Sequence, residues 1–290
     1  MKPIDIVLAV AVAVIWGVGF VATRFAVDEM SATLLTALRF AITALPCLFL
    51  PRPKLSLGLI IAISWLLVAQ FLAQTYGLAH GVPAGLTAVI VQSQALFTVA
   101  FAALFLRELP TRIQVLGIAI AMCGLLMICF TVGYDFSVWA FSVSMTAPIS
   151  FAVSNLLLRR AQGVSMVDLF AWIGLFAMAP LLVVLFTVDG PAVTWHALTH
   201  MSLLAALCVL ALALLGTTLG YWIWGRLLRN YSAAQVVPFA LLVPFFGAGA
   251  SSIVFGETFG PLRLTGMIIV VFGIGVMLLS RRPPPLVEVA

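Results

Sequence analysis

Charged side chains are scarce in this sequence. Only 8% of its 290 residues are Asp, Glu, Lys or Arg, and 64% are hydrophobic, whereas about a quarter of a soluble domain is charged. So few charges cannot cover a surface that faces water. We therefore expect an integral membrane protein surrounded by the lipid bilayer, with no room for a separate soluble domain.

Residues that bind metals or form disulfides are also few. There are four cysteines and three histidines. His196 and His200 stand four residues apart, but no third ligand is near, so an interfacial helix explains them better than a zinc site. Cysteines inside apolar helices act as small apolar residues, and all four lie in apolar runs: Cys47, Cys123, Cys129 and Cys208. We expect neither a metal nor a disulfide.

Two further absences narrow the function. The chain has no glycine-rich phosphate loop, so it does not hydrolyse ATP by itself. It also has no cluster of His, Asp or Glu at membrane depth, which an integral-membrane enzyme would need. We therefore expect neither an enzyme nor a cofactor. A lipid scramblase would need a hydrophilic groove open to lipid, and the sequence leaves that alternative open.

Long apolar runs are the dominant feature. About 20 apolar residues in a helix span a hydrocarbon core of about 30 Å. The runs predict an all-α protein with ten transmembrane helices, near residues 5–27, 32–50, 57–79, 82–106, 112–130, 138–158, 166–188, 201–228, 232–255 and 262–280.

The basic residues are distributed unequally between the two faces of the membrane. With ten helices, one face receives eleven of them and the other only Arg24 and Arg263, while Arg39 lies inside a helix. Because cytoplasmic loops carry the excess of Lys and Arg, we expect both termini to be cytoplasmic in a cell inner membrane. The net charge of +5 then marks topology and not a nucleic-acid site. The eleven are Lys2, Arg52, Lys54, Arg107, Arg112, Arg159, Arg160, Arg226, Arg229, Arg281 and Arg282.

The chain contains an internal repeat. Residues 82–128 have a second version 149 positions later, at 231–277. Each copy reads as an apolar helix, a turn with one glutamate and a second helix with glycines seven apart, a spacing that suits close helix packing. The matched positions include Glu108 with Glu257, Gly117 with Gly266 and Gly124 with Gly273.

In the earlier part of each repeat the two copies are 135 positions apart. There WGVGF, which precedes Arg24, matches FAVSN, which precedes Arg159. The chain thus divides into a first five-helix repeat at 1–133, a second at 134–282 and a cytoplasmic tail at 283–290. Because five is odd, the second repeat enters the membrane from the opposite face, and the halves are inverted. Many carriers use inverted repeats to make two states, each open to one side.

Arg39 is the one cation at depth, about eight residues and roughly 12 Å from the outer surface. It snorkels toward the outer interface, or it pairs with Asp28 or Glu29, or it lines a cavity and attracts a substrate carboxylate. In contrast, every acidic residue falls at a helix end, in a loop or in a tail. We therefore expect no proton coupling through a buried carboxylate. Arg107 and Glu108 read as a surface pair in a turn.

Other candidates are polar or irregular residues near mid-membrane. Gln70 and Gln74 form a stripe that serves either as interhelical glue or as cavity lining. Gln92 and Gln94 point about 200° apart, so at most one faces a cavity. Pro244 leaves a carbonyl without its donor. The candidate substrate-binding residues are Trp16, Arg39, Gln70, Gln74, Gln94, Tyr221, Trp224 and Pro244.

Several features together indicate a known family. They are the ten spans in two inverted halves, WGVGF in the first helix, Leu38-Arg39-Phe40 in the second, and the glutamate turns. The chain resembles the drug/metabolite transporter superfamily, and within it the EamA-type amino-acid and metabolite exporters with their YddG-like members. The resemblance implies a cavity formed by helices 3, 4, 8 and 9, gated by 1, 2, 6 and 7, with 5 and 10 peripheral. Helix 4 departs from many members, which carry a proline where this chain has Gln94-Ala95.

We expect a secondary transporter that exports amino acids or related small metabolites across the inner membrane by alternating access, without a driving ion. The alternatives are a carrier of another metabolite or drug, including phosphorylated or nucleotide-linked sugars, and a scramblase. A phosphorylated substrate would call for several cavity cations, and the sequence offers one. The sequence predicts no oligomeric state.

Overall fold

The computed structural model describes residues 1–279 except 132–135, 162 and 232, and the described chain is helical with no strand. The predicted boundary between the halves and the tail at 283–290 lie outside these residues. The first half comprises α1 (Pro3–Val27), α2 (Ala32–Ala44), η1 (Leu45–Leu48), α3 (Leu57–Ala79), α4 (Ala84–Gln92), α5 (Gln94–Leu106) and α6 (Arg112–Cys129). The second comprises α7 (Val138–Leu158), η2 (Arg159–Ala161), α8 (Met166–Val184), η3 (Leu185–Asp189), α9 (Pro191–His200), α10 (Leu203–Ala211), η4 (Leu212–Leu219), α11 (Gly220–Asn230), α12 (Ala233–Val236), η5 (Val237–Leu242), α13 (Val243–Phe255) and α14 (Pro261–Leu278).

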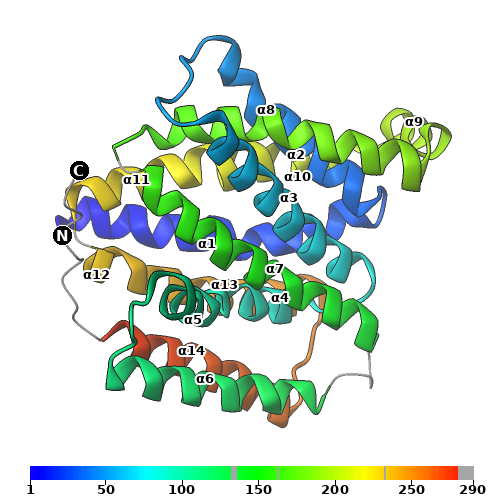
Figure 1. Cartoon of the computed structure of the whole chain (residues 1–290). Helices are drawn as coiled ribbons and strands as arrows, with labels where there is room; N and C mark the ends of the chain where they lie inside the picture. Colours follow the sequence, from blue (N-terminus) through cyan, green and yellow to red (C-terminus); the bar gives the residue numbers. More distant parts are fainter. Residues whose placement is uncertain (132–135, 162, 232, 280–290) are drawn as a thin grey trace.

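These elements form a bundle of membrane-spanning helices (Figure 1). Within the described ranges, nine helices are long and apolar enough to cross a membrane, and Ala32–Leu48 is a shorter apolar helix. At the rises of α and 3₁₀ helices the latter is about 27 Å long, close to a hydrocarbon core of about 30 Å. The all-α, ten-span prediction is confirmed.

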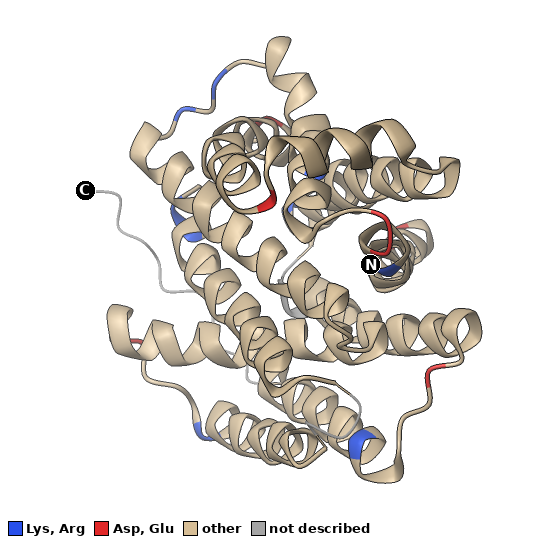
Figure 2. Ribbon diagram, turned by 90° about the vertical axis from the view of Figure 1, so that its right-hand side faces the viewer, with Lys and Arg blue, Asp and Glu red and all other residues tan. Residues whose placement is uncertain are grey.

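Charged residues lie mostly at helix ends and in connecting segments, leaving long uncharged stretches between them (Figure 2). We call the face at which α1 begins and α14 ends the N-terminal face, and the face at which α1 ends the opposite face. Helix ends on the N-terminal face carry Lys2, Arg107, Arg159 and Arg229.

The two halves meet at an antiparallel crossing of α6 and α14. A Cβ on Gly117 would lie 2.6 Å from the Gly273 carbonyl oxygen, and one on Gly124 would lie 2.6 Å from that of Gly266. Such distances leave no room for a side chain. Because Gly117 corresponds to Gly266 and Gly124 to Gly273 in the repeat, each contact is the internal copy of the other. The glycine spacing therefore serves close backbone packing, as predicted, around a pseudo-twofold axis.

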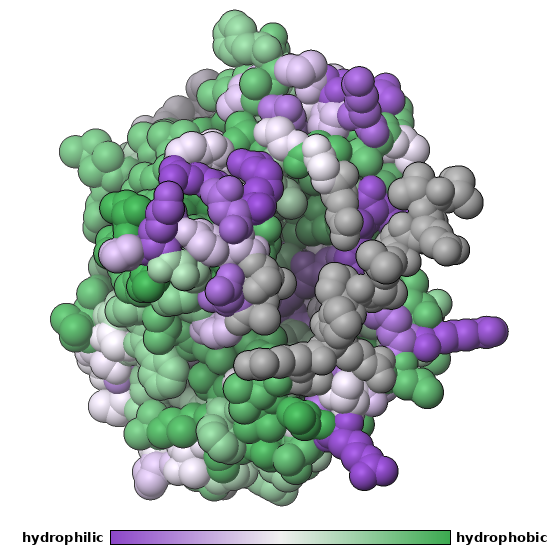
Figure 3. Space-filling view, turned by 90° about the vertical axis from the view of Figure 1, so that its left-hand side faces the viewer, coloured by the Kyte–Doolittle hydropathy of each residue, from purple (hydrophilic) through white to green (hydrophobic). Residues whose placement is uncertain are grey.

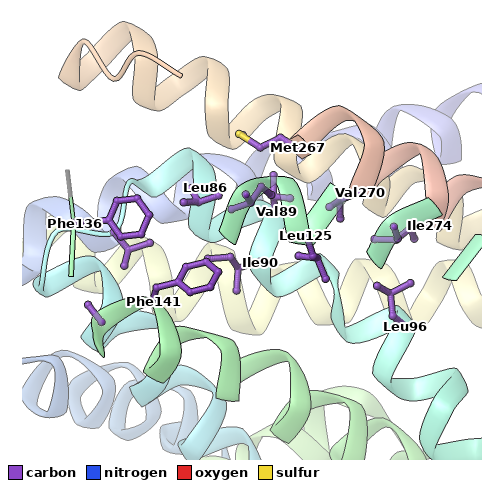
Figure 4. Packing of buried hydrophobic residues seen from close by; sticks show 14 of the residues in the cluster. Leu86, Val89, Ile90, Leu96, Leu125, Phe136, Phe141, Met267, Val270 and Ile274 are labelled. Atoms are coloured by element: carbon purple, nitrogen blue, oxygen red, sulfur yellow. The ribbon is translucent and has the colours of Figure 1, made fainter. Parts of the chain in front are cut away.

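A buried hydrophobic cluster holds this crossing against α4. Leu86, Val89 and Ile90 of α4 face Leu125 of α6 and Val270 of α14 (Figure 4). Each buried side chain of this size contributes about 1.5–3 kcal/mol if water is the alternative. In lipid the same contacts act mainly through close packing. The crossing and α4 thus form a stable wall on one side of the bundle.

The fourth and ninth spans are broken at equivalent positions of the two halves. The fourth span stops at Ser93, between α4 and α5, and the ninth changes from 3₁₀ to α-helix after Leu242. The offset of 149 relates these two residues. The Ser93 hydroxyl donates to the Ile90 carbonyl oxygen at 2.6 Å, and the break forms without a proline at this position. Both halves are therefore broken at matching depth, although only the second uses a proline, Pro244.

The two ends of the bundle are packed differently. Towards the opposite face, α4 packs on α13, and a Cβ on Gly85 would lie 2.7 Å from the Ala248 Cα. Towards the N-terminal face, α5 packs on α7, and among the described residues it has no extensive contact with α1, α11 or η5. Figure 3 shows that face hollowed near its centre, with hydrophilic side chains in the visible part of the hollow. The bundle is closed at the opposite face and open at the N-terminal face.

Candidate functional site

Arg39 of α2 points inward and is half-buried. Its Nε donates to the Thr217 hydroxyl at 2.8 Å, and its guanidinium carbon lies 4.2 Å from the centroid of the Phe71 ring. A cation over an aromatic face gains about 0.5–2 kcal/mol. The terminal nitrogens, Nη1 and Nη2, make no hydrogen bond to any part of the chain that the structure describes.

The structure does not support the alternative in which Arg39 pairs with Asp28 or Glu29. Asp28 lies 3.6 Å from Arg24 instead. Glu29 accepts hydrogen bonds from the side chain and the backbone of Ser202, which hold the pKa of its carboxyl below the ordinary value. Both acids are satisfied at the end of α1, so the arginine remains inside the bundle without a carboxylate among the described residues.

A π-helical segment, η4, presents the groups that hold Arg39. The wider turn of a π-helix is rare and is frequent at functional sites. Here the Thr217 hydroxyl donates to the Leu212 carbonyl oxygen five residues back, at 3.1 Å, while it accepts from Arg39. The neighbouring Gly216 carbonyl accepts from Trp16 Nε1 at 2.9 Å. Consecutive residues of η4 therefore fix Arg39 and Trp16.

Aromatic rings continue from Trp16 along α11. The ring centroid of Trp16 lies 5.4 Å from that of Tyr221 and 5.2 Å from that of Trp224, and Tyr221 stacks on Phe170 at 4.0 Å. A Cβ on Gly220 would lie 2.7 Å from Trp16 Nε1, so a glycine is needed for α1 to approach this closely. The structure therefore brings together four of the predicted residues: Trp16, Arg39, Tyr221 and Trp224.

Gln70 and Gln74 lie inside the bundle on α3, exposed by only 3% and 6%. The Oε1 atom of each is buried and has no hydrogen-bond partner within the described chain. An unsatisfied buried acceptor costs about 1–3 kcal/mol. Interhelical glue would have a partner, so the structure does not support that reading. These two oxygens are available to a donor from water or a bound molecule.

Gln94 and Pro244 lie elsewhere. Gln94 Oε1 accepts from Asn155 Nδ2, which joins α5 to α7 on the far side of the hollow from Trp16. Pro244 is buried at the start of α13, where α1 passes so closely that a Cβ on Gly17 would lie 2.8 Å from the Val243 carbonyl oxygen. Among the described residues, neither Gln94 nor Pro244 makes a hydrogen bond to Arg39 or Trp16. Gln94 joins α5 to α7 on the side of the hollow opposite Trp16. Pro244 lies at the break in the ninth span.

Two acidic residues differ from expectation. Asp5 lies at a helix end, as predicted, but is only 5% exposed, and it accepts from the Tyr231 hydroxyl at 2.7 Å with Arg226 Nη2 at 3.8 Å. Glu108 pairs with Arg159 of η2 at 3.0 Å and not with Arg107, whose backbone is left-handed (φ 57°). His196 and His200 stack at 4.2 Å, and the described residues contain no metal-binding cluster.

Some residues at the site were not predicted to belong to it. Phe71 and Phe170 come from α3 and α8 and read in sequence as ordinary lipid or core residues. Thr217 shares one helix side with Tyr221 and Trp224 at a spacing of four and seven, which was a usable signal. Asn155 lies in FAVSN, the segment that matches WGVGF in the repeat. This match to the segment that contains Trp16 was the available signal.

A ten-span bundle of two inverted five-helix repeats, hollow at one face and holding a half-buried cation beside aromatic rings, has the architecture of a secondary transporter. The EamA-like transporter family matches the chain twice, over residues 4–130 and 138–279. The chain belongs to that family. The two matches fall one in each half.

Several known proteins are similar to it. A Salmonella typhimurium protein named "Probable amino-acid metabolite efflux pump" is 31% identical over 92% of each chain, and an Escherichia coli protein of that name is 30% identical over 96% of each. A Streptantibioticus cattleyicolor "Probable terminal-alkyne amino-acid exporter" is 28% identical over 71% of this chain and 67% of its own. One solved crystal structure shares the fold, with a TM-score of 0.68 at 15% identity, covering 96% of this chain and 98% of the other.

Proposed function

We propose that this protein exports amino acids or closely related small metabolites across the inner membrane by alternating access, as a facilitative carrier without a cofactor. The observation that carries the proposal is Arg39, which is held by Thr217 and Phe71 while its terminal nitrogens have no hydrogen-bond partner among the described residues. A guanidinium with two free nitrogens matches the two oxygens of a carboxylate. The names of the relatives support the same substrate class.

The surroundings of Arg39 suit the rest of an amino acid. Trp16 and Arg39 are fixed by adjacent residues of η4, whose Cα atoms are about 3.8 Å apart. A carboxylate at Arg39 therefore places an α-ammonium within reach of the aromatic rings, where cation–π attraction contributes about 0.5–2 kcal/mol. The unsatisfied oxygens of Gln70 and Gln74 supply further acceptors for N–H donors. Apolar walls accept different side chains, so we expect broad specificity.

The charges support an orientation for the carrier. The N-terminal face carries most of the basic residues, and an excess of Lys and Arg is typical of the cytoplasmic side. In this orientation the hollow opens to the cytoplasm, where an exporter collects its substrate. Reporter fusions after Ala290 and after Asp189 should report opposite sides of the membrane. Reports from the same side would contradict both the topology and this orientation.

The test is counterflow in proteoliposomes with a panel of radiolabelled amino acids, together with analogues that lack either the carboxylate or the amino group. Arg39→Gln should abolish uptake of every substrate that has a carboxylate. Arg112→Gln is the matched control, because Arg112 is exposed at the start of α6. Uptake that survives Arg39→Gln, or equal uptake of the carboxylate-free analogue, would refute the assigned role of Arg39.

A further inference from the structure

Two arginines and two glutamates form corresponding pairs in the repeat. Arg24 corresponds to Arg159 at the offset of 135, and Glu257 to Glu108 at the offset of 149. Both glutamates follow a residue with left-handed backbone, Arg107 (φ 57°) in one half and Gly256 (φ 65°) in the other. These four charges therefore occupy equivalent places at the two ends of the bundle.

Only one of the two pairs is formed. At the open N-terminal face, Arg159 Nη1 donates to both carboxylate oxygens of Glu108, at 3.0 and 3.1 Å, and joins the ends of α7 and α5. At the closed opposite face, Arg24 and Glu257 have other partners. Arg24 donates to the Leu78 carbonyl oxygen at the end of α3, at 2.6 Å.

Glu257 instead fastens the closed face. Its carboxylate accepts from the first two backbone amides of α4, Ala84 N at 2.8 Å and Gly85 N at 3.2 Å. These amides have no partner inside the helix, and the helix dipole favours an anion there. The turn after α13 is thereby tied to the start of α4, so opening this face must release the carboxylate.

The released carboxylate has a cation beside it. Phe25 and Phe255 are in ring contact at 4.9 Å, so the end of α1 touches the end of α13. Arg24 and Glu257 are one and two residues from these rings. The Phe25–Phe255 contact therefore brings together the two helix ends that carry these charges.

We propose that Arg24 and Glu257 form an ion pair in the state open at the opposite face, and that the Arg159–Glu108 pair is then broken. Inverted repeats interconvert by exchanging the conformations of their halves, so each pair belongs to the state in which its own face is open. The proposal rests on the alternating access of the proposed function. The four residues are positioning residues for transport and touch no substrate.

The test measures the conformation directly and needs no substrate. In a chain whose four cysteines are replaced by alanine, spin labels at Leu106→Cys and Gln235→Cys report the separation of α5 from α12, and both positions are exposed. Closure of the N-terminal face shortens this distance. The exchanged pair Arg24→Glu/Glu257→Arg is compared with Arg24→Glu/Glu257→Gln. Both variants lose the Glu257 carboxylate that binds the α4 amides, and both lose Arg24. Only the exchanged pair can form the ion pair.

We expect the ratio of short to long distances to be on the order of two- to five-fold higher in the exchanged pair, the effect of a partly exposed ion pair. Equal ratios would overturn the proposal. If the exchanged pair does not fold, Arg159→Gln gives a second test, because it should raise the short-distance fraction while Arg107→Gln leaves it unchanged. Identical distributions for these two variants would also overturn it. If the distances shift as expected but no amino acid is transported, the proposed substrate class is refuted. The ion-pair exchange is still supported in that case.

Discussion

Arg39 in α2 and Thr217 in η4 are joined by a hydrogen bond of 2.8 Å from the guanidinium Nε to the threonine hydroxyl, across 178 positions of the sequence. The same hydroxyl donates to the Leu212 carbonyl oxygen. Its rotation is therefore fixed, and it presents a lone pair to the arginine. The bond orients the guanidinium plane while the two outer nitrogens stay available.

Removal of this hydroxyl should weaken substrate binding. Thr217→Val keeps the side-chain volume and removes the acceptor, which costs about 1–1.5 kcal/mol and should raise KM about five- to ten-fold. Thr218→Val is the matched control, because Thr218 makes the same five-residue bond, to Ala213, without contacting Arg39. Initial rates of counterflow at several substrate concentrations measure the effect. Equal KM values for both variants would contradict a role for Thr217 in orienting Arg39.

The buried glutamines should reveal a trade-off between stability and transport. Gln70→Leu and Gln74→Leu remove an unsatisfied oxygen at nearly constant volume, so each should raise the free energy of unfolding by about 1–3 kcal/mol. Each should also lower the transport rate. Gln92→Leu should instead destabilise the protein, because Gln92 Nε2 donates to the Ala240 carbonyl oxygen. Thermal unfolding in detergent and counterflow measure both effects. Lower stability of the Gln70 and Gln74 variants would mean that their oxygens have partners.

The α6–α14 crossing should not tolerate a methyl group. The Cβ of Gly124→Ala would lie 2.6 Å from the Gly266 carbonyl oxygen, and overpacking of this kind costs about 1–3 kcal/mol. Gly249→Ala in α13 is the control, because nothing lies within 4 Å of its added Cβ and alanine favours the helix by about 1 kcal/mol. The two variants should shift the melting temperature in opposite directions. A neutral Gly124→Ala would show that the crossing can relax.

Transport should not require a proton gradient. Asp5 is the buried acid of the described chain, and it is engaged by Tyr231 and Arg226 at the N-terminal end of α1, away from Arg39. We expect no accumulation of substrate when a pH gradient is imposed at zero membrane potential. Accumulation that an uncoupler abolishes would contradict this, and its loss in Asp5→Asn would identify the coupling residue. Asp168→Asn, at the start of α8, serves as the control carboxylate.

Sequence patterns were sufficient for the parts of the structure that depend on local composition. Apolar length gave the spans, and the glycine and glutamate repeats gave the inverted halves. Trp16 was predicted from its place in WGVGF, and Tyr221 and Trp224 from their position on one side of the eighth span. The π-helix at η4 has no local marker, because the same residues also suit an α-helix. The break at Ser93 occurs without proline, and the Arg159–Glu108 pair spans 51 positions, so both depend on tertiary packing.

The contact between α6 and α14 is made by a pair of glycines that each half of the chain contains. Gly117 and Gly124 meet Gly273 and Gly266, their own counterparts in reverse order. A five-helix ancestor with one such glycine pair satisfies the same geometry as an antiparallel homodimer, provided that it inserts in both orientations. Joining two such subunits in one polypeptide would turn the contact between subunits into the contact between its two halves.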